Sequence, residues 1–301
     1  MKTWQYAWIV FLGGGCLGVL STVVKLGYSA GFSAAEVTGS QFLFGAALIW
    51  MVVLFTKKKK TEPIQALKIS LSGIPMGMTG IFYYKSLQTL DVSLAIIFLF
   101  QFIWIGTLFE WMLYKKKPTR NKVVSITVLL VGSILAVGTI TNGMAVITWQ
   151  GAIWGMLAAF TFSTFLFFSG TVGKHTPPIL KSALISIGSL FIAFLLFPPV
   201  FLFHGPAFAG IAPYGLLLGL FGVALPPLLF SIGMPHVGTG YGTILAASEL
   251  PVAIILSALI LKESVTIIQW FGVILILGGI IIGNLTFARH KISKKTETMI
   301  S

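Results

Sequence analysis

Charged residues are scarce in this chain of 301 residues. Only 9% of the residues are charged, against roughly 25% in a soluble domain, and 56% are hydrophobic. No charged residue occurs from Val123 to Gly173 or from Ser182 to Ser248. These runs exclude a water-soluble fold, and they lack the alternating strands of about ten residues that form membrane β-barrels. The sequence therefore predicts an all-α polytopic membrane protein.

Cysteine and catalytic motifs are equally scarce. The single cysteine, Cys16, cannot form an internal disulfide, and it lies in the first apolar segment. The four histidines are far apart, and no HExxH, Cys-His, P-loop, Gly-x-Ser-x-Gly or dinucleotide motif occurs. We expect no catalytic residues, no metal and no cofactor, and therefore no enzymatic activity.

Acidic residues are few, so the net charge is +13, from 20 basic and 7 acidic residues. In a soluble chain this excess would suggest nucleic-acid binding. Here the basic residues lie in short runs at the ends of apolar segments, which indicates a lipid bilayer as partner and no nucleic acid. With a cytoplasmic N-terminus, 17 of the 20 fall inside and only Lys25, Lys85 and Lys262 fall outside. The sequence predicts a protein of the cytoplasmic membrane with both termini in the cytoplasm.

Ten apolar segments are long enough to span a bilayer, which takes about 20 residues per helix. The connections between them are short, so no room remains for a soluble catalytic domain. The expected spans are Trp4–Val24, Ala35–Phe55, Ala66–Leu87, Val92–Leu113, Val123–Ile140, Gln150–Val172, Ser182–Leu202, Pro213–Met234, Gly240–Leu261 and Ile267–Phe287.

A faint internal repeat divides the chain into two halves. A shift of 147 residues places Thr119 on Thr266 and Lys116 on Glu263. Each half holds five spans, an odd number, so the second half must be inverted relative to the first. The same corner is then basic inside and nearly neutral outside, as the positive-inside rule requires. The predicted organisation is a first repeat at 1–145, a second at 146–290 and a cytoplasmic tail at 291–301.

Glu249 is the most informative residue, because it lies near the middle of the ninth expected span. Intramembrane ionisable residues are costly and are functional candidates by default. Small residues at Gly242, Ala246 and Ala253 share its helical face and leave space beside it. We expect Glu249 to bind substrate and to couple proton movement to transport. The alternative is a neutral carboxylic acid that holds two helices together.

Other candidate substrate-binding residues are polar or aromatic and lie within spans. Gln101 aligns with Ser248 in the repeat, and Trp104 shares its helical face. Ser163 lies in the middle of the sixth span. Packing between helices is the alternative for Gln101. Tyr84 approaches the outer end of the third span, where an interfacial aromatic belt competes with an outer gate.

Several prolines interrupt the expected spans, and each leaves a backbone carbonyl without its helical donor. Pro226 and Pro227 lie side by side in the eighth span, and Pro251 follows Glu249. We take these three as hinge candidates, with a packed kink as the alternative. Repeated GxxxG spacings, such as Gly14 with Gly18, predict close packing of helices within the chain.

Patches in both halves resemble the EamA branch of the drug/metabolite transporter superfamily. In the second half these are the Ser-Glu-Leu-Pro-Val run at 248–252, the corner at 261–266, and the last helix with Gly272, Gly278 and Gly279. In the first half residues 83–87 and 93–95 resemble the matching helices. The resemblance implies a cavity built from the first, third, fourth, sixth, eighth and ninth helices.

These observations predict a secondary active transporter that moves a small metabolite, such as an amino acid, by alternating access. Export and proton coupling are part of this hypothesis, and the protein is expected to be a monomer or a homodimer. The alternative within transport is efflux of drugs or cationic compounds. An intramembrane enzyme would need a nucleophile, a base or a metal set, and a scaffold would show no substrate flux.

Overall fold

The computed structural model describes residues 3–56, 61–87, 89–90, 92–115, 117–137, 148–199, 202, 205–262 and 264–300. These residues are all-helical and contain no strand. The Lys57 to Lys60 loop, Lys116 and Glu263, which support the expected topology, lie outside them. The helices are α1 (Thr3–Ser29), α2 (Ala34–Leu54), α3 (Pro63–Leu71), α4 (Ile74–Leu87), α5 (Val92–Leu99), α6 (Phe102–Tyr114), α7 (Arg120–Val137), α8 (Trp149–Thr171), α9 (Pro178–Leu196), α10 (Gly205–Gly219), the π-helical η2 (Leu220–Ala224), α11 (Leu225–Val237), α12 (Thr239–Ala246), α13 (Glu249–Ile260) and α14 (Ile267–Ile300).

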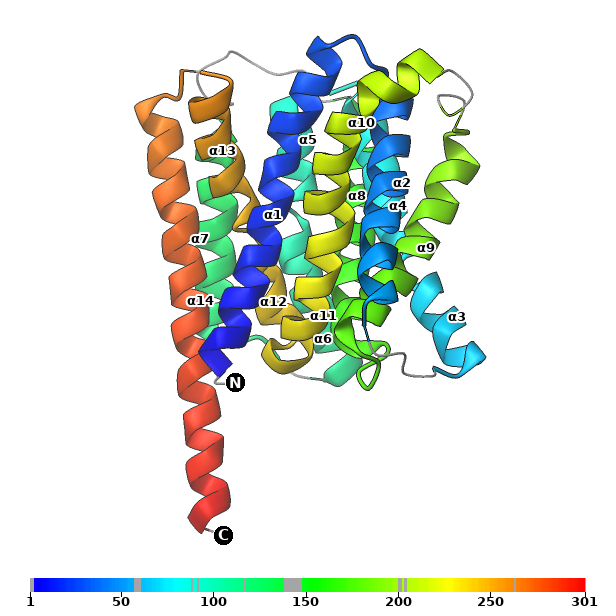
Figure 1. Cartoon of the computed structure of the whole chain (residues 1–301). Helices are drawn as coiled ribbons and strands as arrows, with labels where there is room; N and C mark the ends of the chain where they lie inside the picture. Colours follow the sequence, from blue (N-terminus) through cyan, green and yellow to red (C-terminus); the bar gives the residue numbers. More distant parts are fainter. Residues whose placement is uncertain are drawn as a thin grey trace.

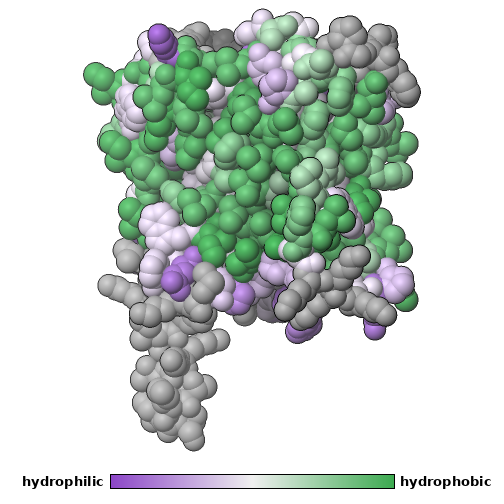
Figure 2. Space-filling view, viewed as in Figure 1, coloured by the Kyte–Doolittle hydropathy of each residue, from purple (hydrophilic) through white to green (hydrophobic). Residues whose placement is uncertain are grey.

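The helices form a bundle that is suited to a bilayer. Eight helical segments of the described chain are long and apolar enough to cross a membrane, and Ile267–Gly283 is a shorter apolar helix. Figure 2 shows a broad apolar surface, with hydrophilic residues gathered near its two ends. We call the end where α1 begins the lower end and the end where α1 finishes the upper end (Figure 1). The chain is therefore a multi-pass membrane protein.

The third expected span is divided into two helices in the structure. Residues Ala66–Leu87 are divided between α3 and α4, which are separated at Ser72 and Gly73. Pro75 has no N–H with which to bond the carbonyl of Leu71, so the helical ladder is interrupted here. Neither piece reaches the length of a full span alone.

The 147-residue repeat reappears in the positions of the helix breaks. The pair α5 and α6 is separated at Phe100 and Gln101, and the pair α12 and α13 is separated at Ala247 and Ser248. Both positions differ by 147 residues, as do the first residues of α7 and α14. Lys115 and Lys262 end the two broken pairs with φ values of 57° and 53°. Among the described residues they are the only non-glycine residues with positive φ.

Close packing of α1 against the second break fixes the centre of the bundle. A Cβ atom at Gly14 would meet the carbonyl of Ala246 and the hydroxyl of Ser248. A Cβ atom at Gly18 would meet the carbonyl of Glu249. The GxxxG spacing of these glycines thus serves contact within the chain, because only glycine lets the backbones come this close.

Candidate functional site: a central cavity

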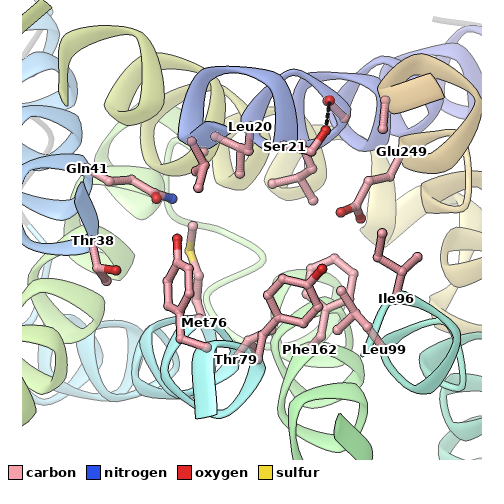
Figure 3. Close-up of a pocket in the computed structure, with 18 of the residues that line it drawn as sticks. Leu20, Ser21, Thr38, Gln41, Met76, Thr79, Ile96, Leu99, Phe162 and Glu249 are labelled. Atoms are coloured by element: carbon pink, nitrogen blue, oxygen red, sulfur yellow. Dashed lines mark hydrogen bonds between the residues drawn. The ribbon is translucent and has the colours of Figure 1, made fainter. Parts of the chain in front are cut away.

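A cavity of about 280 Å³ lies between helices of both halves of the chain. Its walls come from α1, α2, α4 and α5 of the first half and from α8, η2 and α13 of the second (Figure 3). Lys25 and Tyr28, both exposed near the upper end of α1, line it, so the cavity extends towards that end. Its other polar lining residues are Ser21, Thr38, Gln41, Thr79, Tyr83, Tyr84 and Glu249.

Glu249 is the acidic residue of this lining, and it is the first residue of α13. Figure 3 shows its carboxylate directed into the space between the helices. Its Oε2 atom is buried and has no hydrogen-bond partner among the described residues. Burial without a partner penalises the charged carboxylate, whereas the positive end of the α13 dipole favours it. A positively charged group of a bound molecule would supply the partner that this carboxylate lacks.

The break before Glu249 has a local cause in the sequence. Pro251 cannot donate to the carbonyl of Ala247, which instead accepts a bond from the N–H of Leu250 at 3.4 Å. The hydroxyl of Ser248 donates to the carbonyl of Phe11 on α1 at 2.6 Å. The proline and the contact with α1 therefore hold the end of α13, and with it the carboxylate of Glu249, at the cavity wall.

Tyr84, expected as a substrate-binding residue, lines the cavity. Its hydroxyl group lies close enough to the hydroxyl groups of Tyr28 and Thr38 for hydrogen bonding. In Figure 3, Thr38 and Gln41 lie across the space from Glu249. The cavity thus has a carboxylate on one side and a group of neutral hydroxyl and amide groups on the other.

Gln101 and Trp104, expected in the same site, do not line the cavity. The Gln101 amide donates to the carbonyl of Ile97 at 3.0 Å and accepts a bond from Trp104 Nε1 at 2.8 Å. In an unbroken helix the carbonyl of Ile97 would receive the backbone N–H of Gln101, which here bonds Phe98 instead. The Gln101 side chain thus replaces a missing backbone hydrogen bond at the break.

Ser163 is also absent from the cavity lining, although its neighbour Phe162 belongs to it. The Ser163 side chain is fully buried, and its hydroxyl has no hydrogen-bond partner among the described residues. Substrate contact by Gln101, Trp104 and Ser163 stays a prediction.

The three hinge candidates lie at helical irregularities beside the cavity. Pro226 and Pro227 are buried in the first turn of α11, directly after η2, and Gly222 of η2 lines the cavity. Pro251 is buried in the first turn of α13. The backbone N–H groups of a first helical turn have no acceptor within the helix, so a proline, which has no N–H, is tolerated there. These three prolines therefore mark where each helix restarts.

The contribution of α2 was missed from the sequence. Thr38, Gln41 and Phe42 line the cavity, although the expected cavity omitted the second span. Gln41 is a polar residue inside an apolar span, the same signal that selected Gln101. In the part of the chain that the structure describes, no group of three His, Cys, Asp or Glu side chains could hold a metal ion.

Comparisons with known proteins agree with this architecture. Residues 4–138 and 149–285 each match the model of the EamA-like transporter family. A solved crystal structure is similar to the chain with a TM-score of 0.73, and the match covers 95% of this chain and 97% of that chain. At 16% sequence identity this similarity shows the fold alone. No curated protein gives a significant match.

Proposed function

Because the chain belongs to the EamA-like transporter family, we propose that it is a secondary active transporter for a small metabolite such as an amino acid. In this proposal it exports its substrate across the cytoplasmic membrane by alternating access. The observation that carries the proposal is the central cavity, to which both repeats contribute and into which the Glu249 carboxylate points.

The proposal includes ten spans arranged as two inverted repeats with cytoplasmic termini. Support comes from helix directions, since α1 rises from the lower end while α8 begins at the upper end (Figure 1). The last helix, α14, ends at the lower end, as expected for an even number of spans. The described corner between α6 and α7, with Lys115, Lys117 and Arg120, lies at this end (Figure 1), which supports a cytoplasmic lower end.

We propose that a proton gradient drives transport and that Glu249 couples proton movement to substrate movement. In its protonated form the Glu249 side chain is a neutral carboxylic acid. It can release its proton when the ammonium group of a substrate enters the cavity, because this group then pairs with the carboxylate that is left. The neutral group around Thr38, Gln41 and Tyr84 is suited to the carboxylate or other polar end of the substrate. One group would thus exchange proton for substrate within one cavity.

The second candidate is efflux of cationic compounds with large apolar bodies. It is favoured by aromatic side chains in the lining, at Phe42, Phe100, Phe162 and Phe165, beside the Glu249 carboxylate. Aromatic faces attract cations and bury apolar surface. A zwitterionic amino acid and an organic cation therefore share the amine but differ in the need for the neutral group.

The test is flux in proteoliposomes with an imposed pH gradient and a panel of amino acids and organic cations. We expect at least one compound to accumulate, and we expect Glu249→Gln to fold normally and lose this accumulation. Glu62→Gln, the same change at an exposed site at the start of α3, is the matched control and should transport normally. Normal accumulation by Glu249→Gln would refute the coupling role, and no flux of any compound would refute transport.

A further inference from the structure

A buried ion pair lies at the lower end, away from the central cavity. Lys122 Nζ of α7 is 2.5 Å from Glu110 Oε2 of α6. The Lys122 side chain is 4% exposed and that of Glu110 is 17% exposed. Removing one partner from a buried pair leaves an uncompensated charge, so the two residues act as a unit.

The ion pair rests directly on the second repeat. A Cβ atom at Gly240, in the first turn of α12, would collide with both Lys122 Nζ and Glu110 Oε2. Lys122 Nζ also lies 4.6 Å from the ring centroid of Tyr241, in a cation–π contact. Gly238, which precedes α12, has a φ of 85°, and a Cβ atom added there would lie 3.7 Å from Glu110 Oε1. The two residues of this ion pair, both in the first repeat, therefore contact the start of α12 in the second repeat.

Further up, α6 and α12 are tightly packed. The hydroxyl of Thr243 donates to the carbonyl of Ile103 at 3.3 Å, and a Cβ atom at Gly106 would collide with Thr243. The helices above them, α5 above α6 and α13 above α12, line the cavity instead. Ile96 and Leu99 of α5 and Ala253 of α13 line the central cavity. The two broken helices thus meet below their breaks, and the cavity opens between them above the breaks.

The repeat-related positions at the upper end carry no such charges. A shift of 147 residues takes Glu110 to Ser257 and Lys122 to Gln269. Lys122 and Gln269 occupy the same place after a capping threonine, because each backbone N–H bonds the hydroxyl of Thr119 or Thr266. The Gln269 side chain returns to its own cap and accepts from the N–H of Thr266 at 2.8 Å. Lys122 has no acceptor atom for this role and reaches Glu110 instead.

We propose that the Glu110–Lys122 pair is a lock that holds α6 and α12 together below the cavity. We call this contact the lower gate. The lock biases the protein towards the state with its cavity open at the upper end. The lower gate opens only when the start of α12 leaves this pair. A second cavity of about 210 Å³, lined by Glu110, Gly238 and Thr239 among others, provides space for that movement. The lock rests on the alternating access of the proposed function, but it concerns gate equilibrium and not substrate identity.

Cysteine accessibility in detergent tests the lock without any substrate. Two reporters are introduced separately into a Cys16→Ser background: Thr243→Cys, fully buried at the contact of α6 and α12, and Ser21→Cys, in the cavity lining. The probe is a charged methanethiosulfonate reagent. We expect Glu110→Gln to speed labelling at 243 about tenfold, which corresponds to about 1.4 kcal/mol, and to slow labelling at 21.

Two further variants keep the test decisive if Glu110→Gln does not fold. Gly240→Ala retains both charges but places a methyl group where the pair rests, so it should open the lower gate as well. The double exchange Glu110→Lys with Lys122→Glu should restore slow labelling at 243. Unchanged rates in Gly240→Ala, or faster labelling at both reporters together, would overturn the lock. Absent flux in proteoliposomes would refute transport and leave these rates unaffected.

Discussion

The break between α5 and α6 and the break between α12 and α13 lie at equivalent positions, and α5 and α12 each have 8 residues. The side chains at the two breaks, however, make different contacts. At the first break Gln101 bonds its own helix through the carbonyl of Ile97. At the second, Ser248 bonds α1 and Glu249 points into the cavity. The duplicated backbone has therefore kept its shape while only one copy carries the charged group.

The helices that support the two breaks differ in the same way. Gly14 and Gly18 of α1 bring its backbone against the second break. Their repeat-related residues in α8 are Thr161 and Phe165, and Phe165 lines the cavity instead. A tight contact on one side and a large aromatic side chain on the other create an asymmetric cavity from two similar halves.

The largest expected effect on stability comes from breaking the tight contact. Gly14→Val places side-chain atoms against the backbone of Ala246, and overpacking of this kind costs about 1–3 kcal/mol. We expect a lower thermal unfolding midpoint in detergent together with loss of flux. Gly278→Val is the matched control, because a Cβ atom at Gly278 meets nothing within 4 Å. Equal midpoints for the two variants would show that α1 does not hold the second break.

A smaller effect is expected at the first break. Gln101→Glu removes the amide that donates to the carbonyl of Ile97, and one intramolecular hydrogen bond contributes about 0.5–1.5 kcal/mol. We expect a lower midpoint but no new pH dependence of flux, because this side chain does not line the cavity. Gln269→Glu is the control, since its carboxylate can still accept from Thr266. A gain of pH-driven flux in Gln101→Glu would place residue 101 in the transport site.

Much of the fold could be predicted from the sequence, because a bilayer demands long apolar helices with internally satisfied backbones. The place of Glu249 at the cavity could be expected for the same reason, since a carboxylate that faces lipid is costly. The break at Pro251 also has a visible cause. The break at Gln101 has no proline, and its side chain reveals its role only when its partner atoms are known.

The facing of polar residues within spans was the part that sequence could not settle. Gln41 and Ser163 are both polar and lie within apolar spans, yet only Gln41 lines the cavity. Nearly every face of these helices is apolar, either towards lipid or towards other helices, so periodicity does not identify the cavity side. Which neighbours a helix packs against decides the outcome, and this depends on contacts far apart in the chain.

The smallest expected effect on stability is at Pro251, whose replacement separates the two causes of the second break. Pro251→Ala supplies an N–H for the carbonyl of Ala247, so the helix can become continuous. A proline in a first turn contributes little to stability, so we expect the unfolding free energy to change by less than about 1 kcal/mol. The thermal unfolding midpoint should therefore shift only slightly. Flux should fall, because a straight helix moves the Glu249 carboxylate away from its present position. Pro63→Ala, at the exposed start of α3, is the control. Normal flux in Pro251→Ala would mean that contact with α1, through Ser248 and Phe11, is sufficient to hold the break.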